Sequence, residues 1–354
     1  MFKDNIDNEQ WNQILDREIW LRLAKISQAG VMLGEIAKTR LGTLSDQYPQ
    51  WKIAEDGRDE FPFWMGDGDE SRKFVKTPRP YSELVDWLKK NPTSNHWEEE
   101  DDWKKCCRDD FEATSHALSE LSTGDIWPID RWRQALQAWS EENLIKCSWP
   151  SVGTVLSKVP YDVLQPLVNG VSWWLKAISK SFNGNDELFL ELCRRVLTLE
   201  YTESDDSENP VSRAINHPVG YVTEALLNWC FQQSPEDGQG LPAELSIIFT
   251  DICNSNDGKY RHGRVLLSIH IIALFRLDRE WAIQYLLPSF DWRQSEVEAR
   301  IAWEGFLWSP RLYRPLMELI KKPFLDTAVH YEKIGAFGQQ YATLLTFAAL
   351  DRYI

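Results

Sequence analysis

The stretch Arg261-His262-Gly263 contains the residue types in this sequence that are best suited to chemistry. An imidazole can act as a nucleophile, and a neighbouring guanidinium can hold phosphate oxygens through paired hydrogen bonds. These three residues therefore define one hypothesis, in which the chain is a phosphatase-like hydrolase.

The surroundings of this tripeptide favour a structural interpretation. It is similar to the phosphohistidine loop of the histidine phosphatases, where the tripeptide follows a buried strand. Here it follows the polar stretch "NSNDGKY" and leads directly into an apolar helical segment. That pattern is typical of a helix N-terminus with exposed basic side chains, so the hydrolase is kept as the alternative function.

A second histidine stands in "NHPVGYVTEALLNWC", residues 216–230. Pro218 cannot donate a backbone hydrogen bond and disfavours helical geometry in the residue before it, so we expect one helix to end and another to begin here. Asn216 or His217 could then cap free N–H groups, and Gly220 would allow a close approach of another segment. A catalytic His217 would need an orienting carboxylate, and Glu224 lies two turns along the helix. The structural role is the stronger interpretation.

Metal and cofactor motifs are missing from the sequence. The six cysteines form no C-x-x-C pair, and neither a phosphate-binding P-loop nor a G-x-G-x-x-G stretch occurs. A calcium-loop register through "NSNDGKYRHGR" would place Cys253 first and Arg264 twelfth, where carboxylates are required. We therefore predict no metal site, no cofactor and reduced thiols.

Charge limits the class of partner. The net charge of −15 opposes a general role in nucleic-acid binding, because phosphate groups would be repelled. No stretch has the length and apolarity of a membrane-spanning helix, and the N-terminus lacks the pattern of a secretory signal. These features favour a cytoplasmic protein whose partner is another protein or a small molecule.

Helical periodicity runs through most of the chain. Apolar residues recur at three- and four-residue intervals, as on one face of a helix. The stripes occur at 164–178, 189–196, 222–230, 245–252, 265–275 and 337–348. We therefore expect an all-α fold of irregular stacked helical hairpins, either an α-solenoid (HEAT-like array) or a large bundle, with little or no β-structure.

The stripes also suggest a division of the chain. Residues 1–125 read as an irregular helical part with a long loop around 50–80, and residues 126–354 as the helical array. Ser309-Pro310 offers an N-cap followed by proline, which predicts a helix start within the array.

Eighteen tryptophans are the unusual feature of the composition. Most of them are expected in the core, because several lie within helical stripes. Tryptophan, tyrosine and arginine are also the types enriched at binding hot spots. The candidate contacts with a partner are Trp97, Trp103, Trp308, Arg311, Tyr313 and Arg314.

Three stretches of the sequence resemble a known group of proteins: 216–230, "WEGFLWSPRLYRPLMELIKKPFL" (303–325) and "HYEKIGAFGQQYATLLTFAAL" (330–350). Over roughly residues 128–354 the chain resembles the helical C-terminal region of bacterial antiviral-defence proteins with an N-terminal sirtuin-type NADase. The resemblance implies a region that recognises an invader component or holds the oligomer. The sirtuin domain itself is absent, so no catalytic residue carries over, and the chain is either an excised region or a stand-alone relative.

Three functions are therefore open at this point. The first is a non-catalytic recognition and scaffold module of an anti-phage system, which senses a phage protein and/or mediates oligomerisation for a sirtuin-type NADase. The second is the hydrolase using Arg261, His262 and Gly263. In the third, the chain regulates an NADase encoded in the same operon without contacting the invader.

Overall fold

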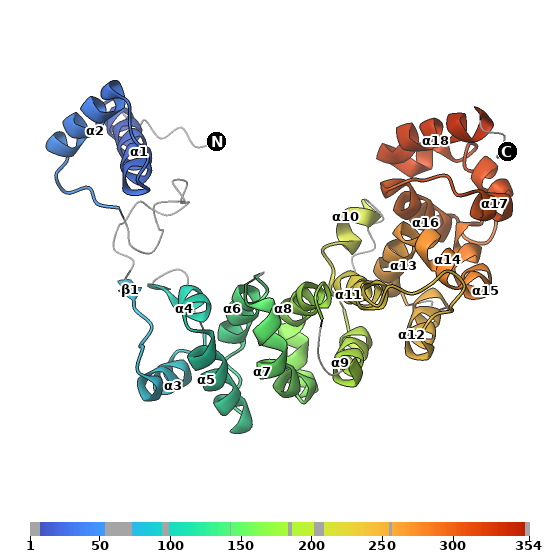
Figure 1. Ribbon diagram of the computed structural model, residues 1–354, viewed down its shortest axis with the longest axis horizontal. Helices are drawn as coiled ribbons and strands as arrows, with labels where there is room; N and C mark the ends of the chain where they lie inside the picture. Colours follow the sequence, from blue (N-terminus) through green and yellow to red (C-terminus); the bar gives the residue numbers. More distant parts are fainter. Residues whose placement is uncertain are drawn as a thin grey trace. The chain divides into compact units, whose positions relative to one another are not determined.

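The structure, a computed structural model, describes residues 8–53, 73–93, 99–141, 143–182, 186–201, 209–254 and 257–350. Contacts divide the chain into a first unit, Met1–Lys73, and a second unit, Phe74–Ile354. The described residues are almost entirely helical, which confirms the all-α prediction (Figure 1). None of the described helices is long and apolar enough to cross a membrane.

The first unit is a helical hairpin made of α1 (Asn8–Gln28) and α2 (Glu35–Gln47). Trp20 on α1 is buried against α2, and its indole N–H donates to Ser45 Oγ over 3.0 Å. An ion pair of 2.5 Å between Arg40 and Asp16 also joins the two helices. The long loop expected around 50–80 falls mostly outside the described residues.

The chain continues with a short two-stranded sheet, β1 (Lys73–Val75), which begins at the division between the units, paired with β2 (Glu99–Asp101) of the second unit. Its first helices are α3 (Tyr81–Lys90), α4 (Trp103–Asp109), α5 (Phe111–Thr123), α6 (Ile129–Trp139), α7 (Ile145–Ser157), α8 (Tyr161–Ser179) and α9 (Asp186–Thr198). They are followed by α10 (Pro210–Ala214), α11 (Pro218–Gln232), α12 (Ala243–Asn254) and α13 (Tyr260–Ile269).

The last part of the second unit is less regular. It contains α14 (Ile271–Leu277), α15 (Arg279–Trp281), a π-helical turn η2 (Ala282–Leu286), a 3₁₀ turn η3 (Leu287–Phe290), α16 (Glu296–Trp308), α17 (Arg314–Asp326), the 3₁₀ segment η4 (Tyr331–Phe337) and α18 (Gly338–Leu350). The apolar run 265–275 is broken at His270, whose backbone leaves helical geometry between α13 and α14.

The helices of the second unit stack in two rows. One row runs α4, α6, α8, α11, α13 and α16, each helix contacting the next, and the other runs α3, α5, α7 and α9. Contacts between α4 and α5, α7 and α8, and α8 and α9 connect the rows (Figure 1). This is the arrangement expected for stacked helical hairpins, in which each hairpin buries its apolar faces against its neighbours.

The division of the chain falls between Lys73 and Phe74 rather than near residue 125. The reason is that α4 packs on α6 and α5 packs on α7, so the helices before residue 125 belong to the same stack as those after it. The polar turn around 125 connects two neighbouring helices of one array.

Tryptophans fill much of this core, as the sequence suggested. Among the largest fully buried side chains are Trp103, Trp132, Trp139, Trp174 and Trp303. Of the tryptophans whose side chains the structure describes, only Trp173 and Trp308 are exposed, at 44% and 52%. An exposed tryptophan is therefore the exception among those whose side chains the structure describes.

Candidate functional site

The two histidine-containing segments found in the sequence meet where α10, α11 and α13 come together. His217 is the N-cap of α11, with Pro218 as the first helical residue. Its Nδ1 accepts a hydrogen bond of 3.2 Å from the backbone N–H of Val219. This nitrogen is therefore an acceptor, which places the proton of the neutral ring on Nε2. The predicted helix start is confirmed.

Asn216 and Gly220 complete this junction. The Asn216 side-chain amide donates to the Ser212 carbonyl over 2.8 Å, so it serves the end of α10. A Cβ atom on Gly220 would lie 1.7 Å from the Ala214 carbonyl oxygen. Only glycine fits there, and the close approach predicted from the sequence is made by the last residue of α10.

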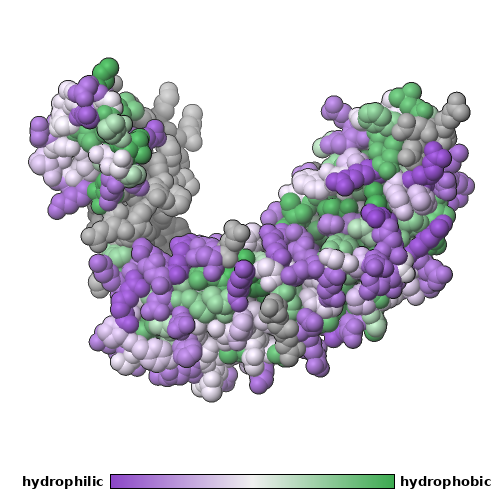
Figure 2. Space-filling view, in the orientation of Figure 1, coloured by the Kyte–Doolittle hydropathy of each residue, from purple (hydrophilic) through white to green (hydrophobic). Residues whose placement is uncertain are grey.

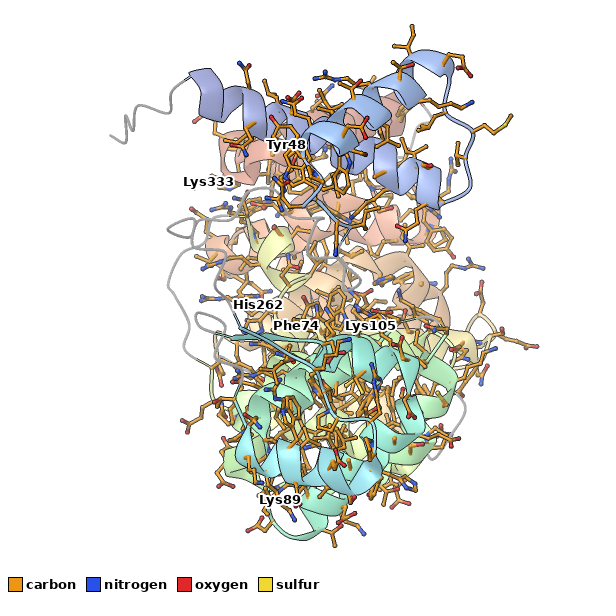
Figure 3. All side chains as sticks on the ribbon, turned by 90° about the vertical axis from the view of Figure 1, so that its left-hand side faces the viewer. Tyr48, Phe74, Lys89, Lys105, His262 and Lys333 are labelled. Carbon is orange, nitrogen blue, oxygen red and sulfur yellow. The ribbon has the colours of Figure 1, made fainter. Side chains whose placement is uncertain are left out.

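His262, which is labelled in Figure 3, lies in the first turn of α13 and stacks on His217. The ring centroids are 3.9 Å apart and the ring planes differ by 20°. Tyr201 also contacts His217, with its ring centroid 4.9 Å from that of the imidazole. The three rings form one half-buried aromatic cluster.

The arginines beside His262 bind a carboxylate of the protein. Arg261 Nε donates to Glu298 over 3.0 Å, and Arg264 Nε donates to the same carboxylate over 2.7 Å. Arg264 is buried and also donates to the Ile252 carbonyl over 2.8 Å. Glu298 stands in the first turn of α16, where Ser295 caps the helix. These contacts join α12, α13 and α16.

Gly263 is also explained by packing. A Cβ atom at this position would meet Ile252 Cγ2 at 2.8 Å and Thr223 Oγ1 at 3.0 Å. The absent side chain lets α13 approach α11 and α12. Each residue of Arg261-His262-Gly263 thus has a role in joining helices.

Burial and nearby positive charges lower the pKa of both imidazoles. The pKa of His217 is lowered to about 4, mainly by burial and also by the charge of Arg213. The pKa of His262 is lowered to about 3, mainly by burial and also by His217 and the nearby arginines Arg213, Arg261 and Arg264. A positive charge on either ring would be disfavoured by burial, at His217 also by Arg213 and at His262 by several positive neighbours.

The carboxylate that could orient His217 for catalysis binds another residue. Glu224, considered as an orienting carboxylate for His217, forms an ion pair of 2.8 Å with Lys176 instead. No group of three or more histidine, cysteine, aspartate or glutamate side chains within the described part of the chain is arranged to hold a metal ion. The geometry is that of a helix junction built from aromatic stacking, a cap and ion pairs.

The candidate contacts with a partner divide into two groups. Trp97 lies outside the described residues. Trp103 is fully buried and donates its indole N–H to the Arg131 carbonyl over 3.0 Å, so the interpretation as a surface contact is wrong. The physical reason is that Trp103, Cys106 and Cys107 lie at helical spacing on the buried face of α4, within a stretch dense in charge.

Arg131 forms a structural node beside Trp103 that sequence reasoning missed. Its guanidinium bonds to Asp101 over 2.7 Å and to the Asn91 carbonyl over 2.9 Å, and it stacks 4.5 Å above the Trp87 ring. A cavity of about 200 Å³ lies next to it. Because the guanidinium is held by protein groups, we interpret this cluster as the link between β2, α3 and α6.

The second group, which we call the 308–314 surface, consists of Trp308, Arg311, Tyr313 and Arg314. Trp308 ends α16 and is exposed, with its ring 6.3 Å from that of Phe337. Arg311 and Arg314 are exposed as well, and Tyr313 is half-buried with its ring 6.2 Å from that of Phe275. The structure brings these four residues into the connection between two consecutive helices.

The helix start predicted at Ser309-Pro310 is wrong. Ser309 ends α16, and α17 begins at Arg314 with Tyr313 as its N-cap. Residues 310–313 lie outside both helices, and Arg311 is exposed in this connection. The ring of Tyr313 packs on that of Phe275, a contact with a distant segment that is not visible in the local pattern.

Comparison of this chain with protein-family models, with curated proteins and with solved structures finds no match.

Proposed function

We propose that the chain is a non-catalytic recognition and scaffold module of an anti-phage defence system. In this proposal it senses an invader protein and holds copies together for a sirtuin-type NADase. The resemblance of residues 128–354 to the helical region of such defence proteins supports this context. The stacked helices support the class of function, since arrays of this kind offer extended faces for binding proteins.

The main support for the proposal is the exposure of Trp308, Arg311 and Arg314 on the 308–314 surface. Trp308 is 52% exposed in a protein that buries most of its described tryptophans. Two exposed arginines, Arg311 and Arg314, flank Tyr313 beside it. A guanidinium and an indole can anchor a partner that presents carboxylates next to apolar side chains.

The net charge of the chain limits the kind of partner that can bind at this surface. With a net charge of −15, most of the surface repels acidic proteins. Arg279 lies 5.5 Å above the Phe275 ring, on which Tyr313 packs, and so adds a further cation close to this surface. We therefore expect an acidic, partly apolar segment of the invader protein to bind here.

Affinity capture from infected cells tests the proposal. The tagged chain is compared with a variant carrying Trp308→Ala, Arg311→Ala and Arg314→Ala, and captured proteins are identified by mass spectrometry. The matched control is Trp173→Ala, which removes the other exposed tryptophan. We expect the wild type and the control to capture one phage protein, and the triple variant to lose it. Equal capture by all three proteins, or capture of no phage protein, contradicts the proposal.

A further inference from the structure

The cavity beside Arg131 lies in the first part of the second unit, among β1, α3, β2 and α6. Its lining includes three apolar residues, Val75 of β1, Trp87 of α3 and Pro92. The outer surface is different, since hydrophilic residues cover much of the second unit on the face in Figure 2. The cavity therefore offers a space in which an apolar group can be sheltered from water.

The volume of the cavity, about 200 Å³, limits the size of an occupant. A protein cavity of about 150 Å³ can hold a benzene molecule, and one water molecule in the liquid takes about 30 Å³. A six-membered ring with one small polar substituent therefore fits here, whereas a single ordered water molecule would leave most of the space empty.

Arg131 supplies polar groups for such a molecule. Its side chain is 2% exposed, and its guanidinium carries five N–H donors. Contacts with described residues use three of them. Nε donates to the Asn91 carbonyl over 2.9 Å, Nη1 to Asp101 over 2.7 Å and Nη2 to the Thr93 carbonyl over 3.4 Å. One N–H on each terminal nitrogen is left for a further acceptor, and a buried donor without an acceptor is unfavourable.

The charged residues of the lining favour an anion as that acceptor. Asp101 pairs with Arg131, and its other carboxylate oxygen accepts the Trp103 N–H over 3.0 Å, so both of its oxygens are engaged. Lys90 lines the same cavity, and its ammonium forms no ion pair with a described residue. Two cations and one carboxylate give the lining a net charge of +1, in a chain whose net charge is −15.

We propose that this cavity binds a small monocarboxylate that carries a flat apolar group. Its carboxylate accepts the remaining N–H groups of Arg131 and pairs with the Lys90 ammonium, as charge-assisted hydrogen bonds favour. Its apolar group lies against Val75 and Trp87, in the arrangement usual for small-molecule sites, where a few polar groups orient an otherwise apolar ligand.

The charge of the lining also indicates which oxyanion binds. One cation without a partner balances the single charge of a carboxylate, whereas a phosphate group at neutral pH brings about 1.5 to 2 negative charges into the same space. This site does not rest on the proposed function, and it shares no residue with the 308–314 surface.

Isothermal titration calorimetry of the full chain with sodium benzoate tests the site. We expect one benzoate to bind per chain. Benzyl alcohol, which has the same ring without the charge, should bind at least about fivefold more weakly, and inorganic phosphate should bind more weakly as well.

The variant that locates the binding is Lys90→Gln, which removes the unpaired charge at an exposed position. It should weaken benzoate binding by at least about fivefold and leave benzyl alcohol binding unchanged. The matched control is Lys89→Gln, which removes the neighbouring exposed lysine (labelled in Figure 3) that does not line the cavity. This control should bind benzoate like the wild type.

The proposal is overturned if benzoate does not bind, or if Lys90→Gln and Lys89→Gln bind it equally well, since the ligand would then lie elsewhere. Binding of benzyl alcohol as tight as that of benzoate, or tighter binding of phosphate, would also exclude a carboxylate site. Circular dichroism confirms that both variants fold, since both lysines are exposed.

Discussion

At the scale of single residues, His217 and His262 show how an imidazole can serve structure. Each ring stacks on the other, and His217 also caps a helix with its Nδ1. Both functions require the neutral ring, because a protonated Nδ1 cannot accept the Val219 N–H and two imidazolium rings repel each other. The pKa values of both imidazoles are lowered, which favours the neutral rings that these contacts need.

A pH dependence of stability follows from this pair. The pKa of His217 is lowered to about 4 and that of His262 to about 3, below the ordinary value of 6.5. The stabilisation by the neutral rings is therefore complete above pH 6.5, and it decreases as the pH falls from 6.5 toward about 4 and 3, because over this range the unfolded imidazoles bind protons and the folded ones do not. Since the rings are partly exposed, we expect the pair to cost about 1 to 2 kcal/mol between pH 7 and pH 5.

The variant that measures this contribution is His262→Phe, which keeps an aromatic ring against His217 but cannot be protonated. Urea unfolding at pH 7 and pH 5 should show a smaller loss of stability for the variant than for the wild type. An identical pH dependence in the two proteins would mean that His262 is not held neutral by the fold.

At the scale of helices, the periodic stripes predicted the main elements well. The stripe at 164–178 became α8, and Pro218 marked the start of α11 as expected. Such features are local, because the spacing of apolar residues and the missing N–H of proline act within one helix.

Features that depend on distant contacts were not predictable in the same way. The charged neighbours of Trp103 favour a surface position, whereas its helical spacing with Cys106 and Cys107 indicates the buried face that the structure shows. The stacking of His262 on His217 depends on the packing of α11 against α13, and Tyr313, the N-cap of α17, packs on Phe275 of α14. Neither sequence segment contains information about its partner.

The junction of α10 and α11 allows a test at this scale. Gly220→Ala would place a Cβ atom 1.7 Å from the Ala214 carbonyl oxygen, so the two helices must move apart. We expect a loss of about 3 kcal/mol in the free energy of unfolding, measured by urea denaturation.

The matched control for this substitution is Gly170→Ala within α8. There the nearest atom to the new Cβ, Leu136 Cδ1, lies at an ordinary contact distance of 3.5 Å. Because alanine favours a helix over glycine, this variant should gain about 0.5 to 1 kcal/mol. Similar effects at the two positions would contradict the close approach at Gly220.

At the scale of the whole molecule, the second unit combines a tryptophan-filled stack with two unlike binding sites. The 308–314 surface offers an exposed indole beside arginines, and the cavity beside Arg131 offers a buried guanidinium and Lys90. The stacked histidines and the buried Arg264 lie within helix junctions, away from such roles. The proposed function is therefore binding, with recognition of a protein and of a small carboxylate assigned to different residues.

Binding of the captured phage protein, measured by biolayer interferometry, tests this assignment most directly. We expect His262→Phe to bind within about twofold of the wild type, because it keeps the stack, and the Trp308, Arg311 and Arg314 triple variant to bind at least about a hundredfold more weakly, or 2.7 kcal/mol. Loss of binding in a folded His262→Phe variant, with unchanged binding by the triple variant, would place the functional site at the histidine pair and contradict the proposal.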